Sequence, residues 1–170
     1  MGSAERHIRV RSSRCGGQSG TKCRLWNGSI GVSKQPGGLM HAHEPEKLIE
    51  EFVAAFNAGD LDGLVRDLYE EDVVVVPGPG PEVMSGRDAV VRGLQPVLAT
   101  GGKMSLASVV AIRNGDLALT HTKVRFALPG QEPMERPVGS AEIARRQSDG
   151  TWRYVIDNSL GPAILDETQP

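Results

Sequence analysis

The chain has 170 residues, of which 39% are hydrophobic and 24% charged, values typical of one globular domain. No unbroken apolar run approaches the roughly 20 residues of a membrane-spanning helix, which excludes a span of that kind. Residues 40–170 hold 12 basic and 20 acidic side chains, a net charge of −8. Nucleic acid is therefore an unfavourable partner for this part of the chain.

Residues 1–39 differ in composition from everything that follows. They carry seven Lys or Arg against a single acidic residue, and their hydrophobic residues follow no period. Such a segment buries too little apolar surface to offset its loss of conformational entropy. The sequence predicts a disordered basic arm here, or translated sequence upstream of a start at Met40. The folded domain is expected over 40–165, followed by a flexible tail over 166–170.

Both cysteines, Cys15 and Cys23, lie in this arm with only His7 near them. Two cysteines and one histidine are too few ligands for a structural metal site, and they make no disulfide framework. We therefore expect no metal or other cofactor, and a cytoplasmic location.

Three helices are expected in the first half of the domain. Apolar residues recur with helical spacing after Pro45, a residue suited to the first turn, and Gly59 ends this helix. Asp60 can cap a second, shorter helix. Ser85 begins a sequence with the spacing of a capping box, which predicts a third helix ending at Gly101.

Strands dominate the second half. The first strand is expected at 73–76, where four valines in a row end at Pro77, after a solvated acidic helix end at 70–72. Asn114-Gly115 and residues 148–151 are strong hairpin signals. The four strands that they connect are expected to be antiparallel and to cover residues 104–112, 117–127, 138–147 and 152–159. Helices first and hairpins last indicate an α+β fold rather than a parallel α/β layer.

Several local strings, in this order, resemble the nuclear-transport-factor-2-like superfamily, in its SnoaL-like and ketosteroid-isomerase-like branch. The strings are FVAAFNAGDLDGL at 52–64, LYEEDV at 68–73, SGRDAV at 85–90, GDLA at 115–118 and DGTWR at 149–153. The resemblance implies a cystatin-like roll: a cone-shaped half-barrel in which a curved, mostly antiparallel sheet is wrapped by three helices around a pocket. It also implies a homodimer formed through the sheet.

This family resemblance does not by itself define a reaction, because the superfamily includes enzymes and non-catalytic binding modules. The steroid isomerases use a carboxylate base, a phenol and a protonated acid. Alignment with that branch places these groups on Pro77, Phe52 and Glu142. Two of the three groups are missing, so steroid-type isomerisation by that machinery is not expected.

The same alignment predicts a polar pocket built from strand residues. It points His121, Lys123 and Arg125 inward together, because residues two apart share a face of a strand. On the last hairpin it sends Glu142, Asp157 and Ser159 inward, while apolar walls are expected from Phe52, Phe56 and Leu98.

This pocket would have general acid–base capacity. Asp157 or Glu142 beside His121 could move a proton near neutral pH, and Lys123 or Arg125 could hold an anionic group of a ligand. Asp157 is alternatively a partner in a structural ion pair, the commoner fate of such groups.

The opposite strand phase stays open. It would turn the three basic residues outward and bury Ala118, Thr120, Thr122, Val124 and Phe126. Periodicity does not decide, because Leu117 and Leu119 share the face of His121.

Three functions follow from these observations. The first is an isomerase, cyclase or lyase that works by proton transfer on a small polar or amphipathic molecule, with Asp157, His121 and Glu142 as catalytic candidates. The second is a binding protein without chemistry in the same pocket. The third is an association module that forms a homodimer through the sheet. Neither a membrane nor a nucleic acid is expected as a partner.

Overall fold

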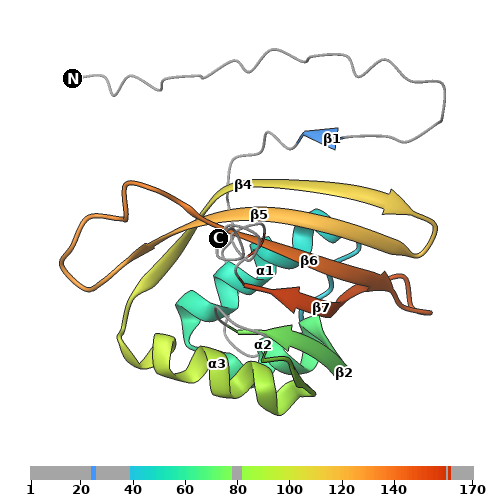
Figure 1. Ribbon diagram of the computed structural model, residues 1–170, viewed down its shortest axis with the longest axis horizontal. Coiled ribbons are helices and arrows are strands. Elements are labelled where there is room, and N and C mark those ends of the chain that lie inside the picture. The colour runs from blue at the N-terminus through green and yellow to red at the C-terminus, as the bar shows by residue number, and fades with distance from the viewer. Residues whose placement is uncertain (1–23, 26–38, 78–81, 160, 162–170) are drawn as a thin grey trace, which may run out of the picture.

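A computed structural model describes residues 24–25, 39–77, 82–159 and 161 of the chain. The two cysteines, most of the predicted arm and the predicted tail lie outside the described residues. In chain order the elements are β1 (Arg24–Leu25), α1 (Pro45–Ala58), α2 (Leu61–Leu68), β2 (Tyr69–Val76), β3 (Met84–Ser85), α3 (Arg87–Ala99), β4 (Lys103–Asn114), β5 (Leu117–Ala127), β6 (Val138–Arg146) and β7 (Trp152–Asn158). The predicted α+β class is confirmed, with three helices and a curved, mostly antiparallel sheet (Figure 1).

The first two helices begin and end where local chemistry predicts. Pro45 occupies the first turn of α1, and Gly59 ends it with φ of 77°, a left-handed conformation that suits glycine. Asp60 then caps α2, because its Oδ1 accepts a hydrogen bond of 2.9 Å from the backbone N–H of Gly63. A side chain at Gly63 would collide with the capping carboxylate, since an added Cβ would lie 2.4 Å from Asp60 Oδ2.

Strand β2 is longer than the four valines suggested. The acidic residues 70–72, expected at a helix end, are part of this strand; Glu71 and Asp72 are exposed, whereas Glu70 is half-buried and accepts from Arg145 and Gln147. Tyr69 is its first residue and is buried. The reason is tertiary: β2 pairs with β7 at Tyr69 and again from Val74, and the acidic residues lie in the register irregularity between these two points.

Helix α3 begins near the expected place but without the predicted capping box. Ser85 belongs to β3 and pairs with Val74, so the N-cap position falls on Gly86, and no side chain caps the helix. The φ of Gly86 is 83°, which lets the backbone turn directly from strand to helix. The capping-box prediction was therefore wrong, although the helix itself is confirmed.

The described strands form one sheet in the order β1-β4-β5-β6-β7-β2-β3. Both predicted hairpins are present. The pairs β4–β5, β5–β6 and β6–β7 are antiparallel, whereas β2 and β7 are parallel. Helix α1 packs mainly on β4 and α3 lies against β2 (Figure 1). The core lies between the helices and the concave face of the sheet.

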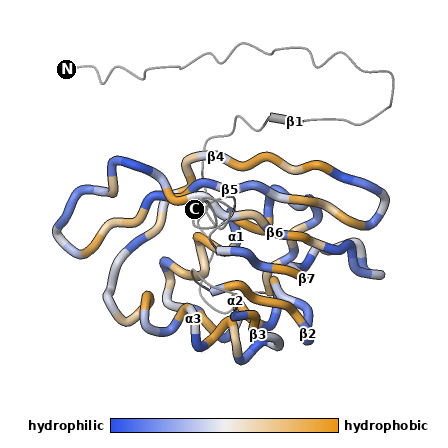
Figure 2. The backbone as a smooth tube through the Cα atoms, in the orientation of Figure 1, coloured by the Kyte–Doolittle hydropathy of each residue, from blue (hydrophilic) through white to orange (hydrophobic). Residues whose placement is uncertain are grey.

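The hydropathy of the strands differs across the sheet. Much of β2 and β4 is hydrophobic, while much of β5 is hydrophilic (Figure 2). Within the described part of the chain, no helix is both long enough and apolar enough to cross a bilayer.

Candidate functional site

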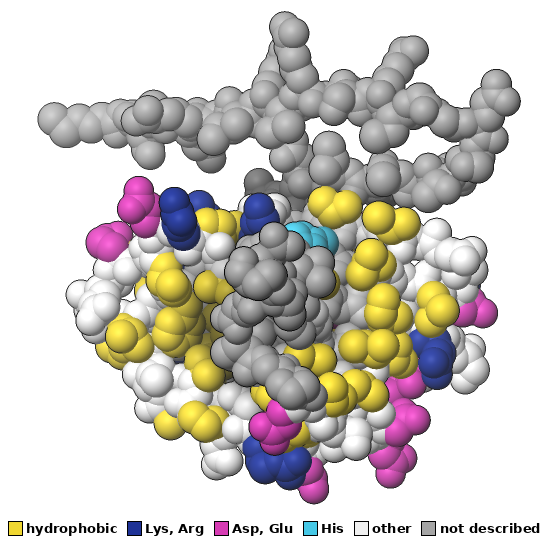
Figure 3. All heavy atoms as spheres, viewed as in Figure 1, with side chains coloured by type: hydrophobic (Ala, Val, Ile, Leu, Met, Phe, Trp, Pro, Cys, Tyr) yellow, Lys and Arg dark blue, Asp and Glu magenta, His cyan; other side chains and the backbone are white. Residues whose placement is uncertain are grey.

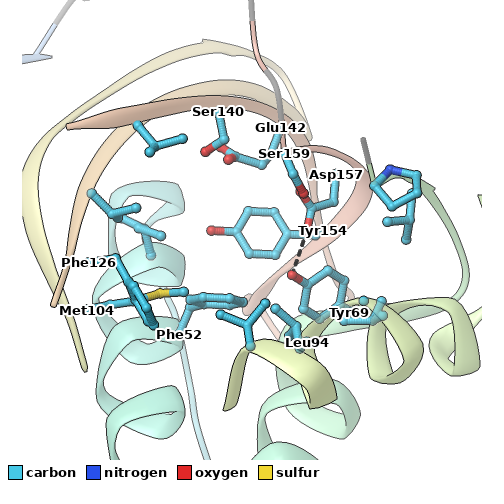
Figure 4. Close-up of a pocket in the computed structure, with 18 residues that line it drawn as sticks. Phe52, Tyr69, Leu94, Met104, Phe126, Ser140, Glu142, Tyr154, Asp157 and Ser159 are labelled. Atoms are coloured by element: carbon cyan, nitrogen blue, oxygen red, sulfur yellow. Dashed lines mark hydrogen bonds between the residues drawn. The ribbon is translucent and has the colours of Figure 1, made fainter. Parts of the chain in front are cut away.

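A cavity of about 320 Å³ lies between the concave face of the sheet and the helices α1 and α3. Most of its lining residues are apolar: Ile49, Phe52, Val75, Pro77, Val90, Gly93, Leu94, Val97, Met104, Val124, Phe126 and Val138. The other lining residues are Tyr69, Ser140, Glu142, Tyr154, Asp157 and Ser159. An apolar cavity with a few converging polar groups is the usual form of a small-molecule site. Figure 4 shows Ser140, Glu142, Ser159 and Asp157 along the sheet, above Phe52, Met104 and Leu94.

Two carboxyl groups define the polar part of the cavity. Glu142 on β6 and Asp157 on β7 are direct cross-strand partners, so their side chains project from the same face of the sheet. We call them the carboxyl pair. Like charges directly opposite each other destabilise a sheet, so two ionised carboxylates are unfavourable here.

Glu142 is held by hydroxyl groups on the neighbouring strand. Thr120 Oγ1 donates to Glu142 Oε2 at 2.7 Å, and Thr122 Oγ1 donates to Glu142 Oε1 at 3.3 Å. Thr122 and Ser140 share a further hydrogen bond of 2.5 Å between their hydroxyl oxygens. Both threonines are 0% exposed, and they meet Glu142 because Thr120 is its cross-strand partner.

Asp157 has a different set of partners. The phenol of Tyr69 donates to Asp157 Oδ2 at 2.7 Å (Figure 4). Tyr69 comes from the first position of β2, and its ring packs against that of Tyr154 with centroids 5.2 Å apart. The carboxyl of Asp157 is thereby fixed against the wall of the cavity.

Burial raises the pKa of both carboxyls. The pKa of Glu142 rises from 4.5 to about 7, because burial and then the charge of Asp157 disfavour the ionised form, while hydrogen bonds from Ser140, Thr120 and Thr122 act in the opposite direction. Burial also raises the pKa of Asp157, against hydrogen bonds from Tyr69 and Ser159. The carboxyl pair can therefore hold a proton near neutral pH.

Tyr69 and Tyr154 line the cavity, although the sequence analysis did not predict either of them there. Tyr154 and Asp157 are three residues apart, a spacing that a regular strand puts on opposite faces. A register irregularity in the β6–β7 pairing, between Ile143 and Ala144, brings both side chains to the concave face. Strand periodicity does not predict such an irregularity, so Tyr154 was missed. Tyr69 was missed because it lies at the boundary between α2 and β2.

The predicted inward phase of β5 was wrong. Thr120, Thr122 and Val124 face the interior, and Lys123 is exposed on the outer face of the sheet. His121 and Arg125 share its phase and are also absent from the cavity lining. The threonine hydroxyls can be satisfied by Glu142 inside the fold, whereas buried cations on this strand would have to be desolvated beneath the helices.

Some of the other residues predicted for the pocket line the cavity, and some do not. Phe52, Glu142, Asp157 and Ser159 line the cavity. Phe56 does not; it is 1% exposed and stacks behind Phe52 with ring centroids 6.4 Å apart. Leu98, one turn after Leu94 on α3, packs against the core and does not line the cavity. The wall prediction was therefore right for one of its three residues.

Two of the three positions at which the steroid isomerases carry catalytic groups hold residues without acid–base capacity in this cavity. Pro77 and Phe52 both line it and can neither accept nor donate a proton, whereas Glu142 keeps a carboxyl. Among the described residues, no group of three or more histidine, cysteine, aspartate and glutamate side chains could hold a metal ion.

Comparison with known proteins supports the fold. The model of the SnoaL-like domain matches residues 49–155, well over half of the chain. No match was found among curated protein sequences.

Solved structures with the same fold have diverse descriptions. A candidate calcium/calmodulin-dependent protein kinase type II association domain from Thiobacillus denitrificans is 24% identical, with a TM-score of 0.57, and the match covers 70% of this chain and 95% of that one. A candidate dehydratase from Streptomyces avermitilis is 22% identical, with a TM-score of 0.54 and coverage of 66% and 88%. A candidate ketosteroid isomerase from Shewanella frigidimarina is 15% identical, with a TM-score of 0.54 and coverage of 65% and 90%. At these identities the similarity shows the fold alone.

Proposed function

Because the chain belongs to the SnoaL-like domain family and encloses a cavity with two facing carboxyls, we propose that it binds a largely apolar small molecule and transfers a proton to and from it. The observation that carries this proposal is the carboxyl pair itself. Glu142 and Asp157 are direct cross-strand partners in a mostly apolar cavity, where only one of them is readily ionised.

The two carboxyls have complementary roles in this mechanism. The ionised member accepts a proton from the bound molecule, and the protonated member donates one or forms a hydrogen bond to developing negative charge. Tyr69 orients Asp157, while Thr120 and Thr122 orient Glu142. A pKa of about 7 for Glu142 suits this task, because a proton is gained and lost with little cost near neutral pH.

The reaction type is an isomerisation or an elimination, as in a lyase. Both need a base and an acid on one side of a bound molecule, and neither needs an oxidant. The candidate dehydratase and the candidate ketosteroid isomerase of the same fold would use proton transfers of this kind. Steroid-type machinery is not part of the proposal, since Pro77 and Phe52 occupy two of its positions.

The test is hydrogen–deuterium exchange in D2O. NMR would follow exchange at carbons next to the carbonyl in cyclic ketones with and without an amino substituent. The wild-type protein is expected to accelerate exchange, and Asp157→Asn to reduce the rate by about 100-fold or more. Asp72→Asn, on an exposed part of β2, is the matched control and should have no effect. Equal exchange rates for wild type and Asp157→Asn would refute the role of Asp157.

A second candidate function is association through the outer face of the sheet. Five apolar side chains lie in register across five neighbouring strands, each the cross-strand partner of the next: Ile112, Leu119, Ile143, Ile156 and Val74. We call this set the outer apolar row. Ile112, Leu119 and Ile156 are 40–43% exposed. Figure 3 shows hydrophobic side chains gathered on this face.

The proposed partner is a second copy of the chain, in a homodimer formed through this face. A continuous apolar row across a sheet is costly to leave in water and would be covered by the same row of a symmetric partner. Sedimentation at micromolar concentration tests this, because a monomer there would argue against the homodimer. Dimerisation and pocket chemistry are compatible, since they use opposite faces of the sheet.

A further inference from the structure

The cavity has acidic groups without a countercharge. Its lining contains two carboxyls and, among the described residues, neither lysine, arginine nor histidine. Arg87 contacts the backbone of the lining residue Tyr69, but its guanidinium donates to the backbone carbonyls of Tyr69 and Arg66. A bound anion would therefore meet two acids and no cation, so the electrostatics of the cavity disfavour it.

The hydroxyl of Tyr154 adds a further polar group to the cavity. Tyr154 is 2% exposed and lines the cavity, and none of the hydrogen bonds found among the described residues involves its hydroxyl. Figure 4 shows this hydroxyl projecting into the middle of the cavity, whereas that of Tyr69 is used by Asp157. Because this hydroxyl opens onto the cavity, it is available to a bound molecule as a donor or an acceptor, independently of the carboxyls.

Aromatic rings complete a surface that attracts positive charge. Phe52, Tyr69, Phe126 and Tyr154 all line the cavity. The faces of such rings carry partial negative charge and stabilise a cation within about 6 Å. These rings also provide apolar surface for the rest of the ligand.

We propose that the ligand of this cavity is a primary amine, bound as its ammonium ion and carrying an apolar body. An ammonium group has three N–H donors, and Glu142, Asp157 and the Tyr154 hydroxyl offer three acceptors on one side of the cavity. The apolar body packs against Phe52, Leu94 and Met104. This inference rests on the proposed binding of a small molecule in the same cavity and specifies its chemical class.

The proposed amine also suits the acid–base chemistry. The carboxyl pair can take one proton from the ammonium, which leaves a neutral amine and a protonated carboxyl, so the charges balance. Each ionised carboxylate has about four acceptor sites, so a bound ammonium does not prevent further proton transfer. The cavity volume of about 320 Å³ equals that of roughly ten water molecules, enough for a body with one ring.

The test uses three one-ring probes of similar size whose polar groups differ in charge: benzylamine, benzyl alcohol and benzoate. Binding to the wild-type chain is measured by NMR titration near pH 7.5. Benzylamine is expected to bind about tenfold more tightly than benzyl alcohol, and benzoate most weakly. Equal or tighter binding of either other probe overturns the proposal, and so does a failure of all three to bind to the folded protein.

Variants separate the charge effect from a general loss of structure. Glu142→Gln and Tyr154→Phe should each reduce the preference for benzylamine over benzyl alcohol by several-fold, with binding of the alcohol nearly unchanged. Glu71→Gln, on an exposed part of β2, is the control and should keep the full preference. An unaltered preference in both pocket variants overturns the assignment of these acceptors. Amide spectra of each variant verify the fold.

The outcomes distinguish this inference from the proposed function. If Asp157→Asn abolishes exchange into ketones but benzylamine has no advantage, the proton-transfer proposal stands and the amine inference fails. If benzylamine is preferred but the wild-type protein promotes no exchange, the cavity is an amine-binding site without the proposed chemistry.

Discussion

The two faces of strand β5 reverse the usual distribution of polar and apolar residues. On the concave face, Thr120 and Thr122 are 0% exposed, whereas on the convex face Leu117 and Leu119 are 45% and 42% exposed. The buried hydroxyls are stable because they donate to Glu142. Among the described residues, nothing gives the exposed leucines a corresponding explanation. This inverted pattern supports both proposals, a small molecule on the concave face and a second chain on the convex face.

The largest expected effect concerns the concave face and pH. The pKa of Glu142 is higher in the folded chain than in the unfolded one, so folding favours its protonated form. Its contribution to stability is full below about pH 4.5 and is lost as the pH rises to about 7. Between these pH values the free energy of unfolding of the wild type should fall by about 3 kcal/mol, and Glu142→Gln should remove this fall. Urea unfolding across the pH range measures both.

Glu71→Gln provides the matched control, because Glu71 is exposed on β2. Its stability curve should follow that of the wild type. Parallel curves for wild type and Glu142→Gln would show that the concave face does not penalise the ionised carboxyl.

The next effect concerns the convex face. Leu119→Glu places a charge within the outer apolar row, and a symmetric partner would bring a second charge to the same interface. The dissociation constant of the proposed homodimer should rise about 30-fold, equivalent to about 2 kcal/mol. Sedimentation velocity measures this directly. Ser108→Glu, on an exposed part of β4 outside the row, should have little effect, and equal dissociation in both variants would rule out the row as the contact.

A smaller effect should follow from Thr120→Val. This change keeps the shape of the side chain but removes a hydrogen bond of 2.7 Å to Glu142. The carboxylate is then less stabilised, so the pKa of Glu142 should rise by about one pH unit, or about 1 kcal/mol. Carbon-13 NMR titration of labelled glutamate measures it, with Ser108→Ala as the control. A fall in this pKa would contradict the donor role of Thr120.

The smallest effect is expected for His121→Ala. His121 lies on the outer face of β5 beyond the outer apolar row, away from the cavity. The exchange rate should stay nearly the same, and the free energy of unfolding should change by less than about 0.5 kcal/mol. A loss of exchange comparable to that of Asp157→Asn would mean that both faces of the strand serve the chemistry.

Much of the fold could be predicted from local chemistry. Pro45, Gly59 and Asp60 define the ends of two helices through interactions within a few residues. Asn114-Gly115 predicts its hairpin for the same reason, since Gly115 has φ of 61° at the turn. Ser85 was misinterpreted because its backbone conformation depends on pairing with Val74, a partner distant in the sequence.

The candidate site was predictable only in part. Glu142 and Asp157 were found through the family resemblance, and their pairing then follows from the hairpin register. Tyr154 was missed because a register irregularity breaks the period of two in this hairpin. Tyr69 was missed because its inward position depends on the pairing between β2 and β7.

The sequence by itself determined the order of the elements, their hairpin connections and the α+β class, because turns, caps and periodicity act over short distances. Only the tertiary structure decided which side of β5 faces the cavity. Leucines and basic residues alternate there with threonines, so both phases offered a mixed face, and burial of the hydroxyls became favourable only once Glu142 lay beside them.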